Sequence, residues 1–278
     1  MNRREFMKST LVAAGIGTVG QFSVSPAALG KETGLDAHGR PAALEPIRGF
    51  VPRFTPVTDG PADPENYTLN YDVVHWRGGR EDAAKSGVVG SLKIERHARE
   101  DAVHYRISQD IGFGGRRNIL QAGIVCSPGL LETLRSWDLH AFSRDANGNK
   151  MPLSVMSEKG RNSAGQIRIE GSNYSYEHSS NRPVVSQWTI LHRFLGGMDG
   201  GTRAEFDLMH DLSVFKPAQE LSYDGEIEAK VKGGRRVKFD TYLQLGEGTL
   251  PIHYVLGDAG RPQFVTAAML SWALTGVD

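Results

Sequence analysis

Several polar residues stand where the sequence predicts the buried face of a β-strand. The alternating residues Leu69, Tyr71 and Val73 are followed two positions later by a histidine, and Leu92 and Ile94 are followed in the same way by an arginine. Because an unpaired polar group costs several kcal/mol to bury, such residues must be paired, solvated or functional. The polar positions that share this pattern are His75, Arg77, Arg96, Gln109, His192 and Glu247.

Two interpretations of these positions remain open. Four of them fall near the ends of predicted strands, where an inward-pointing polar group reaches water at the rim of a sheet. Alternatively, they line an internal cavity in which a few convergent polar groups orient an apolar, amphipathic or sugar-like ligand. In that case we expect Arg96 to pair with Glu247, because a guanidinium and a carboxylate satisfy each other with two hydrogen bonds. The predicted ligand-binding residues are His75, Arg96, Gln109, His192 and Glu247.

Familiar catalytic motifs are mostly absent from the sequence. The phosphate-binding loop, the serine-hydrolase elbow, the zinc-protease helix, the paired-cysteine motif and the EF-hand loop have no match. The interpretation that we favour is a protein that binds an apolar or amphipathic small molecule. The alternative is a carbohydrate-active enzyme, a hydrolase or lyase acting on a glycan, with Glu247 or a histidine as acid or base. A structural or partner-binding protein is a third hypothesis.

The sequence predicts no metal site and identifies no cofactor. His97 and His104 come nearest to a pair, across a predicted hairpin, but no two histidines have the spacing that places both on one face of a strand. Cys126 is the single cysteine, so an internal disulfide is excluded. It ends an apolar run, which predicts a small buried side chain.

Short runs of alternating apolar and polar residues dominate the chain from residue 67 onward and predict strands. Their ranges are 67–77, 86–97, 101–111, 119–126, 137–144, 152–157, 165–171, 184–195, 221–231, 235–245, 250–257 and 262–272. Short helices are expected within 128–137 and 202–214. Successive hairpin turns favour antiparallel pairing, and a sheet of so many strands must curl. The predicted fold class is all-β, a strongly curved antiparallel meander forming a barrel or two-layer β domain, with one or two short helices.

Composition and charge set the class of protein and its organisation. The 278 residues are 39% hydrophobic and 23% charged, with 32 basic and 32 acidic side chains. These values exclude a disordered chain, a coiled coil and a polytopic membrane protein, and the balanced charge predicts no nucleic-acid partner. We expect a signal peptide in 1–30, a proline-rich leader or arm in 31–66 and a single antiparallel β domain in 67–278.

The first residues have the order of an export signal. Arg3 and Arg4 precede Phe6 and Lys8, and residues 11–30 carry no charge. This order resembles the twin-arginine signal, R-R-x-F-L-K, with a methionine in place of the leucine. The resemblance implies that the twin-arginine export machinery is a partner and that the protein is periplasmic, with no stable membrane span after processing. It also permits a bound cofactor, because that route carries folded proteins.

The last third of the chain contains a recognisable order of segments. W-T-I-L-H and F-D-L-M-H are followed by L-S-Y-D-G, by Y-L-Q-L-G-E-G-T-L-P-I-H-Y and by V-L-G-D-A-G-R-P-Q-F-V. This order resembles bacterial envelope proteins of unknown function, which are strongly curved or barrel-like antiparallel β domains. Their last hairpin carries a tyrosine and a short turn, matched here by Tyr254, Asp258, Gly260 and Arg261. The resemblance implies a fold and a compartment but no activity.

Overall fold

A computed structural model describes residues 42–61, 63–75, 86–195, 203–267 and 269–278. The signal peptide expected in 1–30, the first part of the expected leader, and Arg77 lie outside these residues. In the described part, none of the helices has the length and apolar character needed to cross a membrane.

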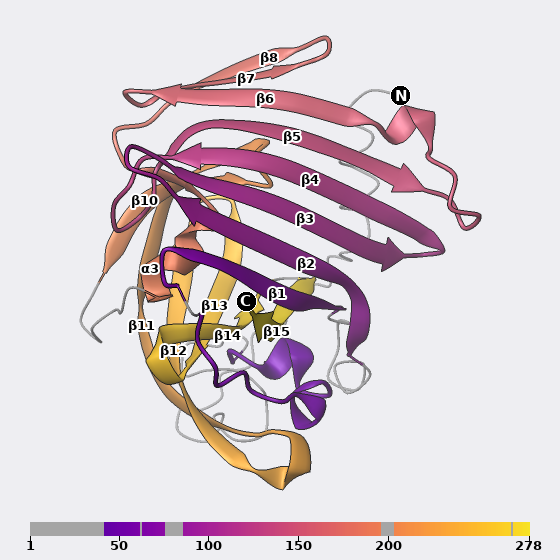
Figure 1. The fold of residues 1–278 in the computed structure, drawn as a ribbon, viewed down its shortest axis with the longest axis vertical. Helices are drawn as coiled ribbons and strands as arrows, with labels where there is room; N and C mark the ends of the chain where they lie inside the picture. Colours follow the sequence, from indigo (N-terminus) through magenta and orange to yellow (C-terminus); the bar gives the residue numbers. More distant parts are fainter. Residues whose placement is uncertain (1–41, 62, 76–85, 196–202, 268) are drawn as a thin grey trace, which may run out of the picture. The chain divides into compact units, whose positions relative to one another are not determined.

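Within the described residues, the strands form one 15-stranded sheet (Figure 1). The strands are β1 (Asn66–His75), β2 (Gly87–Ala98), β3 (Val103–Phe113), β4 (Arg116–Cys126), β5 (Leu134–Arg144), β6 (Met156–Ser163), β7 (Gln166–Gly171), β8 (Ser175–Ser179), β9 (Val184–Ser186), β10 (Ala204–His210), β11 (Val214–Lys230), β12 (Arg236–Gly246), β13 (Thr249–Gly257), β14 (Arg261–Thr266) and β15 (Leu270–Val277). The helical turns are η2 (Glu45–Ile47), η3 (Val51–Arg53), η4 (Pro152–Ser154), η5 (Thr189–Leu191), α3 (His192–Leu195), η6 (Lys232–Gly234) and η7 (Asp258–Gly260).

The sheet consists of two runs of hairpins that meet at the first and last strands. Neighbouring strands pair antiparallel from β1 to β8 and from β10 to β15, and β1 also pairs with β15. β9 is the exception, because it pairs parallel to β10. The sheet curves strongly but does not close into a barrel, since β8 and β9 remain its edges. The predicted all-β class with a strongly curved, mainly antiparallel sheet is confirmed.

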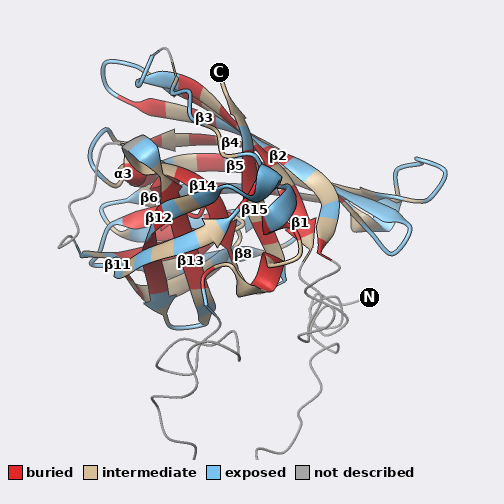
Figure 2. Ribbon diagram, turned by 90° about the horizontal axis from the view of Figure 1, so that it is seen from below, coloured by how far each residue is buried: buried red, intermediate tan, exposed pale blue. Residues whose placement is uncertain are grey.

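The main core lies on the interior face of the curve, and alternate residues along the strands are buried (Figure 2). Ile107 of β3, for example, is fully buried. The helical turn η5–α3 packs against this face. The Phe194 ring of α3 lies 5.4 Å from the Tyr242 ring and 4.8 Å from the Tyr254 ring, measured between centroids. This single turn of helix fills space that the sheet alone would leave empty.

A second core lies on the outer face of β1 and β12–β15, where residues 42–61 cover the sheet. The Phe54 ring lies 4.2 Å from the Phe264 ring, and the Thr266 hydroxyl donates a hydrogen bond of 2.7 Å to the Ala43 carbonyl. In these strands both faces are therefore buried. Alternation alone cannot tell which of the two faces is the interior one.

Several expected elements are wrong. The helix expected in 128–137 is a loop leading into β5, and the described part of 202–214 is strand β10 and its turn. The strand expected at 152–157 begins as η4 and reaches β6 only at Met156, and 262–272 is two strands, β14 and β15. β8 was not expected.

The largest difference is at 184–195, where the expected strand continues only to Ser186 and then becomes η5–α3. Val184, Trp188, Ile190 and Phe194 are all fully buried. Because the residues between them are mostly buried too, the segment has no polar face, and its period cannot distinguish a strand from a helical turn.

Candidate functional site

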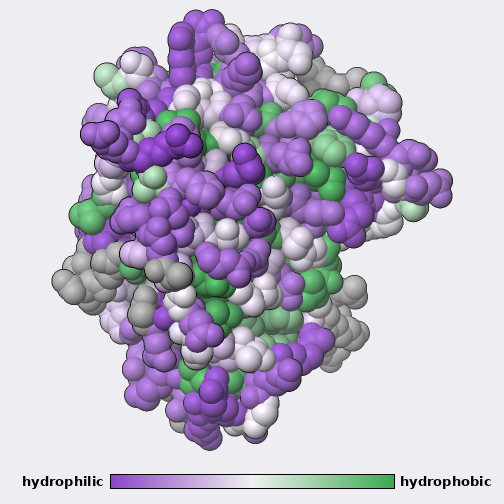
Figure 3. All heavy atoms as spheres, in the orientation of Figure 1, coloured by the Kyte–Doolittle hydropathy of each residue, from purple (hydrophilic) through white to green (hydrophobic). Residues whose placement is uncertain are grey.

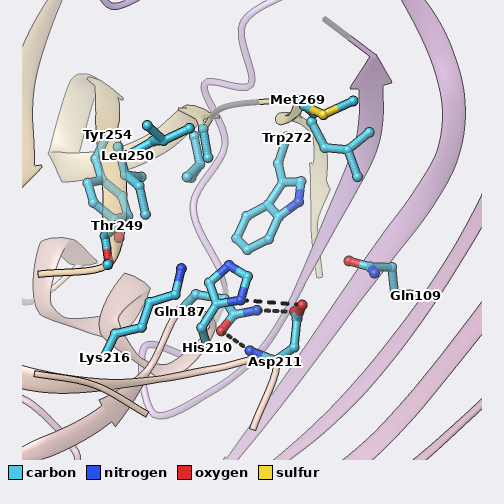
Figure 4. A pocket seen from close by; sticks show the side chains of 15 residues that line it. Gln109, Gln187, His210, Asp211, Lys216, Thr249, Leu250, Tyr254, Met269 and Trp272 are labelled. Atoms are coloured by element: carbon cyan, nitrogen blue, oxygen red, sulfur yellow. Dashed lines mark hydrogen bonds and ion pairs between the residues drawn. The ribbon is translucent and has the colours of Figure 1, made fainter. Parts of the chain in front are cut away.

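A cavity of about 410 Å³ opens on the interior face of the sheet (Figure 4). Its walls come from β3, β10, β11 and β13–β15, which the curvature of the sheet brings around one space. The volume falls within the range of roughly 300–1,000 Å³ that is usual for small-molecule sites. The lining residues are Gln109, Gln187, His210, Asp211, Lys216, Gly248, Thr249, Leu250, Ile252, Tyr254, Val265, Ala267, Met269, Leu270 and Trp272.

Strands β13–β15 supply an apolar wall. Alternation along these strands turns Ile252, Val265 and Trp272 to the interior face. Leu250 and Met269 stand at the rim of the cavity, where they are 64% and 49% exposed. A ligand seated here would remove apolar surface from water, which is the main source of affinity for such a site.

The opposite part of the cavity is polar and is built around the turn after β10. The Gln187 amide makes two hydrogen bonds with Asp211: its Nε2 donates to Oδ1 at 2.5 Å, and its Oε1 accepts from the backbone N–H at 2.8 Å. The other carboxylate oxygen of Asp211 lies 3.4 Å from Nδ1 of His210. These contacts hold the acidic group and the imidazole in fixed positions at the cavity.

The backbone of this turn is strained. Asp211 and Leu212 both have positive φ angles, 49° and 56°, in the left-handed region that costs a residue with a side chain energy. Gln187 fixes the first of them, and the Trp137 indole N–H fixes the second by donating a hydrogen bond of 2.9 Å to the Leu212 carbonyl. Strain of this kind that is held by several contacts is common at functional sites.

A β-bulge turns Lys216 toward the cavity. Phe206 of β10 is paired with Gln219 of β11, but Leu208 is paired with Lys216, so β11 has one extra residue between the two pairs. Because side chains alternate between faces, this extra residue reverses the alternation of β11 beyond the bulge. Lys216 therefore shares the face of its partner Leu208 and lines the cavity.

The bulge is fixed by a buried carboxylate. Asp207 accepts the Ala218 N–H at 2.8 Å and the Ser180 hydroxyl at 2.6 Å. Ala218 itself has a φ of 52°, which fits a residue at a bulge. Burial of the Lys216 amine lowers its pKa, and the negative charge of Asp211 opposes that shift only in part.

Arg96 is buried, as its strand position predicts, but its partner is Glu132 and not Glu247. The guanidinium donates to the Glu132 carboxylate at 2.6 and 3.1 Å, and the Tyr105 hydroxyl donates to the other oxygen of the same carboxylate. Glu65 adds a second, exposed carboxylate at 3.3 Å. Glu132 lies in the loop between β4 and β5, where no strand pattern marks it.

His192 joins the same cluster from α3. Its Nδ1 is 3.2 Å from the Tyr67 hydroxyl, and its Nε2 is 3.6 Å from the Glu132 carboxylate. Burial lowers the pKa of His192, an effect that the nearby Arg96 strengthens and Glu132 opposes. Two of the five expected residues, Arg96 and His192, thus come together.

The other three expected residues lie elsewhere, so the five do not share one cavity. Gln109 lines the cavity of Figure 4. His75 lies against the exposed Phe113, with 5.3 Å between ring centroids. Glu247 is exposed in the turn between β12 and β13. The alternation that leads to Glu247 through Val237 belongs to the outer face of β12, which residues 42–61 cover.

The Arg96 cluster is arranged for stability more than for chemistry. Both oxygens of Glu132 are occupied, one by Arg96 and the other by Tyr105, and the carboxylate is only 1% exposed. A space of about 380 Å³ opens beside it, lined by Arg96, Glu132 and His192 among others. An acid or base in a reaction must exchange protons with a substrate, and this carboxylate has no oxygen free to do so.

Neither the cysteine nor a metal cluster offers a reactive centre in the described residues. Cys126 is fully buried, and burial raises the pKa of its thiol, which disfavours the nucleophilic thiolate. Among the same described residues, no three side chains of histidine, cysteine, aspartate or glutamate gather closely enough to hold a metal ion.

Comparison with known proteins does not assign the chain to a family. No family profile matches the sequence, and a search of curated proteins finds no match.

Sequence reasoning missed the polar end of the cavity for specific reasons. His210 and Asp211 fall in 202–214, where a helix was expected, and Lys216 precedes the range expected for the next strand, which begins at 221. Pro217 and the bulge break the alternation there. The available signal was His210 at the end of the run F-D-L-M-H, whose alternation also fits a strand.

Proposed function

We propose that this protein binds an amphipathic small molecule in the cavity of Figure 4, and that it does so in the periplasm after export. The observation that carries the binding proposal is the division of the cavity into an apolar wall, with Trp272 at its centre, and a polar end built on His210, Asp211 and Lys216. Sites of this kind use the apolar wall for affinity and the few polar groups for orientation.

On the face drawn in Figure 3, a binding role fits better than a purely structural one does. The face drawn in Figure 3 is mostly hydrophilic, with hydrophobic residues in separate patches between polar ones. A stable protein partner usually covers a continuous apolar area. The apolar rim residues Leu250 and Met269 instead belong to a cavity of small-molecule size.

The alternative function, a hydrolase or lyase acting on carbohydrate, has less support. Glu247, the expected acid or base, is exposed in a turn, and the carboxylate of Glu132 is fully occupied. The remaining acidic residue at the cavity, Asp211, is bound to Gln187 and faces His210.

The binding proposal is tested with a neutral apolar fluorophore, N-phenyl-1-naphthylamine, added to the purified protein. We expect saturable binding, and we expect Leu250→Glu to weaken it by about tenfold, because a charge then stands at the apolar rim. Leu153→Glu is the matched control, since Leu153 is fully exposed on η4 and does not line the cavity. Absence of saturable binding, or equal losses in the two variants, contradicts the proposal. Native mass spectrometry of protein isolated from cells then identifies any retained ligand.

A further inference from the structure

The charges at the polar end of the cavity indicate which class of ligand the cavity takes. This inference rests on the proposed function. The only acidic side chain lining the described cavity, Asp211, already has partners for both oxygens: Gln187 at 2.5 Å and His210 at 3.4 Å. Both oxygens of this carboxylate are therefore in contact with groups of the protein itself. A positively charged head group would have to displace one of these contacts to pair with the carboxylate.

Lys216, the cation at the polar end of the cavity, lacks such contacts. Within the described part of the chain, the Lys216 amine makes no hydrogen bond and no ion pair, although the negative charge of Asp211 acts on it. The side chain is half-buried, and Figure 4 shows its amine pointing into the cavity on the same side as the His210 ring. A partly desolvated charge without a partner is costly, so a ligand that supplies the opposite charge gains more than it would from an exposed lysine.

The local backbone fixes the direction in which the Lys216 side chain points. Lys216 faces the cavity because of the bulge at Pro217 and Ala218, and the buried carboxylate of Asp207 holds that bulge at 2.8 Å. Without the extra residue, the alternation of β11 would turn the amine to the other face of the sheet. The fold thus places an amine without a hydrogen-bond partner opposite an apolar wall.

We infer that the ligand is an amphiphile with an anionic head group, which forms an ion pair with Lys216 while its apolar chain lies against Trp272. The apolar chain accounts for the wall formed by β13–β15, and the anion accounts for the unpaired amine. Carboxylates and phosphate monoesters share this chemistry, and the experiment separates them.

The test compares four molecules that carry the same decyl chain but different head groups. Decanoate, decyl phosphate, decanol and decyltrimethylammonium each compete with N-phenyl-1-naphthylamine for the full-length wild-type protein. We expect at least one of the two acids to bind about ten- to a hundredfold more tightly than decanol, because a hydrogen-bonded ion pair forms. The tighter of the two acids identifies the head group, and the cation should bind most weakly.

Substitutions at position 216 assign the effect to the amine. Lys216→Met should abolish the preference for the acid over decanol and leave the affinity for decanol unchanged, whereas Lys216→Arg should keep the preference. Lys159→Met, on an exposed position of β6 outside the cavity, should change neither value. Melting temperatures show whether the variants are folded, and Lys216→Gln, which also removes the charge, decides the question if the methionine variant is not.

The outcomes separate this inference from the proposed function. If all four molecules compete but the acids bind no better than decanol, or if the preference survives in Lys216→Met, the anionic head group is excluded while the apolar cavity stands. If none of the four competes and the fluorophore does not bind, both the cavity proposal and the inference are overturned.

Discussion

Glu132 is the residue on which the buried charge cluster depends. Its carboxylate joins Arg96 of β2 to Tyr105 of β3, and its backbone adopts a φ of 45°, which is unfavourable for a residue with a side chain. The loop between β4 and β5 is thereby fixed to two strands. The cluster stabilises one arrangement of this end of the sheet at the cost of desolvating two charges.

Removing the charge of Glu132 should destabilise the protein strongly. Glu132→Gln leaves the guanidinium of Arg96 buried with only the exposed Glu65 as a charged partner, so we expect a loss of about 3–5 kcal/mol in the free energy of unfolding. Urea denaturation measures this loss. Glu228→Gln provides the matched control, because its ion pair with Arg236 is exposed and should contribute less than about 1 kcal/mol. Similar losses in the two variants would mean that the buried ion pair contributes no more to stability than the exposed one.

At single positions, the sequence predicts burial more reliably than it predicts contacts. Alternation placed Arg96 on the interior face, and it is 2% exposed. Its partner could not be found in the same way, because Glu132 lies in a loop whose left-handed backbone leaves no periodic signal. Glu247 was expected as the partner because its strand has two buried faces, and alternation does not distinguish them.

Among the elements, the contact between β5 and β6 depends on a glycine. Gly160 of β6 is paired with Trp137 of β5, and the indole ring lies across it: a Cβ atom there would stand 1.9 Å from the ring. The same indole donates the hydrogen bond that holds Leu212 in the strained turn at the cavity. A small residue in one strand therefore supports the site through its neighbour.

Adding a methyl group at this position should displace the ring. We expect Gly160→Ala to lower the free energy of unfolding by about 1–3 kcal/mol, as overpacking does in a filled core. Gly276→Ala in β15 is the control, because the nearest atom to a Cβ there is 3.9 Å away. Chemical denaturation of both variants makes the comparison. A Gly160→Ala protein as stable as the Gly276→Ala protein would show that the ring moves without cost.

Most strands were expected close to their observed ranges, including β12 and β13, which are buried on both faces. In β2–β5 the signal is the alternation of polar residues such as Lys93 and Arg106 with buried ones. Prediction failed in two places in particular. Residues 184–195 are buried on all sides, and the bulge in β11 shifts the alternation by one residue, which concealed Lys216.

For the whole molecule, the proposed location depends on its first residues. Replacing Arg3 and Arg4 by lysine keeps the charge but removes the paired guanidinium groups, so we expect the full-length protein to remain in the cytoplasm. Cell fractionation and the mass of the product measure this outcome. Lys8→Arg serves as the control and should be exported. Normal processing of the double lysine variant would exclude the twin-arginine route.

The pairing of β1 with β15 also determines when the molecule can fold. The ribosome delivers β1–β8 as a local run of hairpins well before it delivers β15, and one edge of β1 stays open during that time. Residues 42–61 also cannot pack onto the sheet until β14 is made, since Phe54 contacts Phe264 near the end of the sequence. A nascent chain interrupted before β14 exposes an unpaired edge and an uncovered apolar face, the features that chaperones and proteases recognise. Unfinished chains therefore differ from finished ones in the strand edge and the apolar surface that they expose.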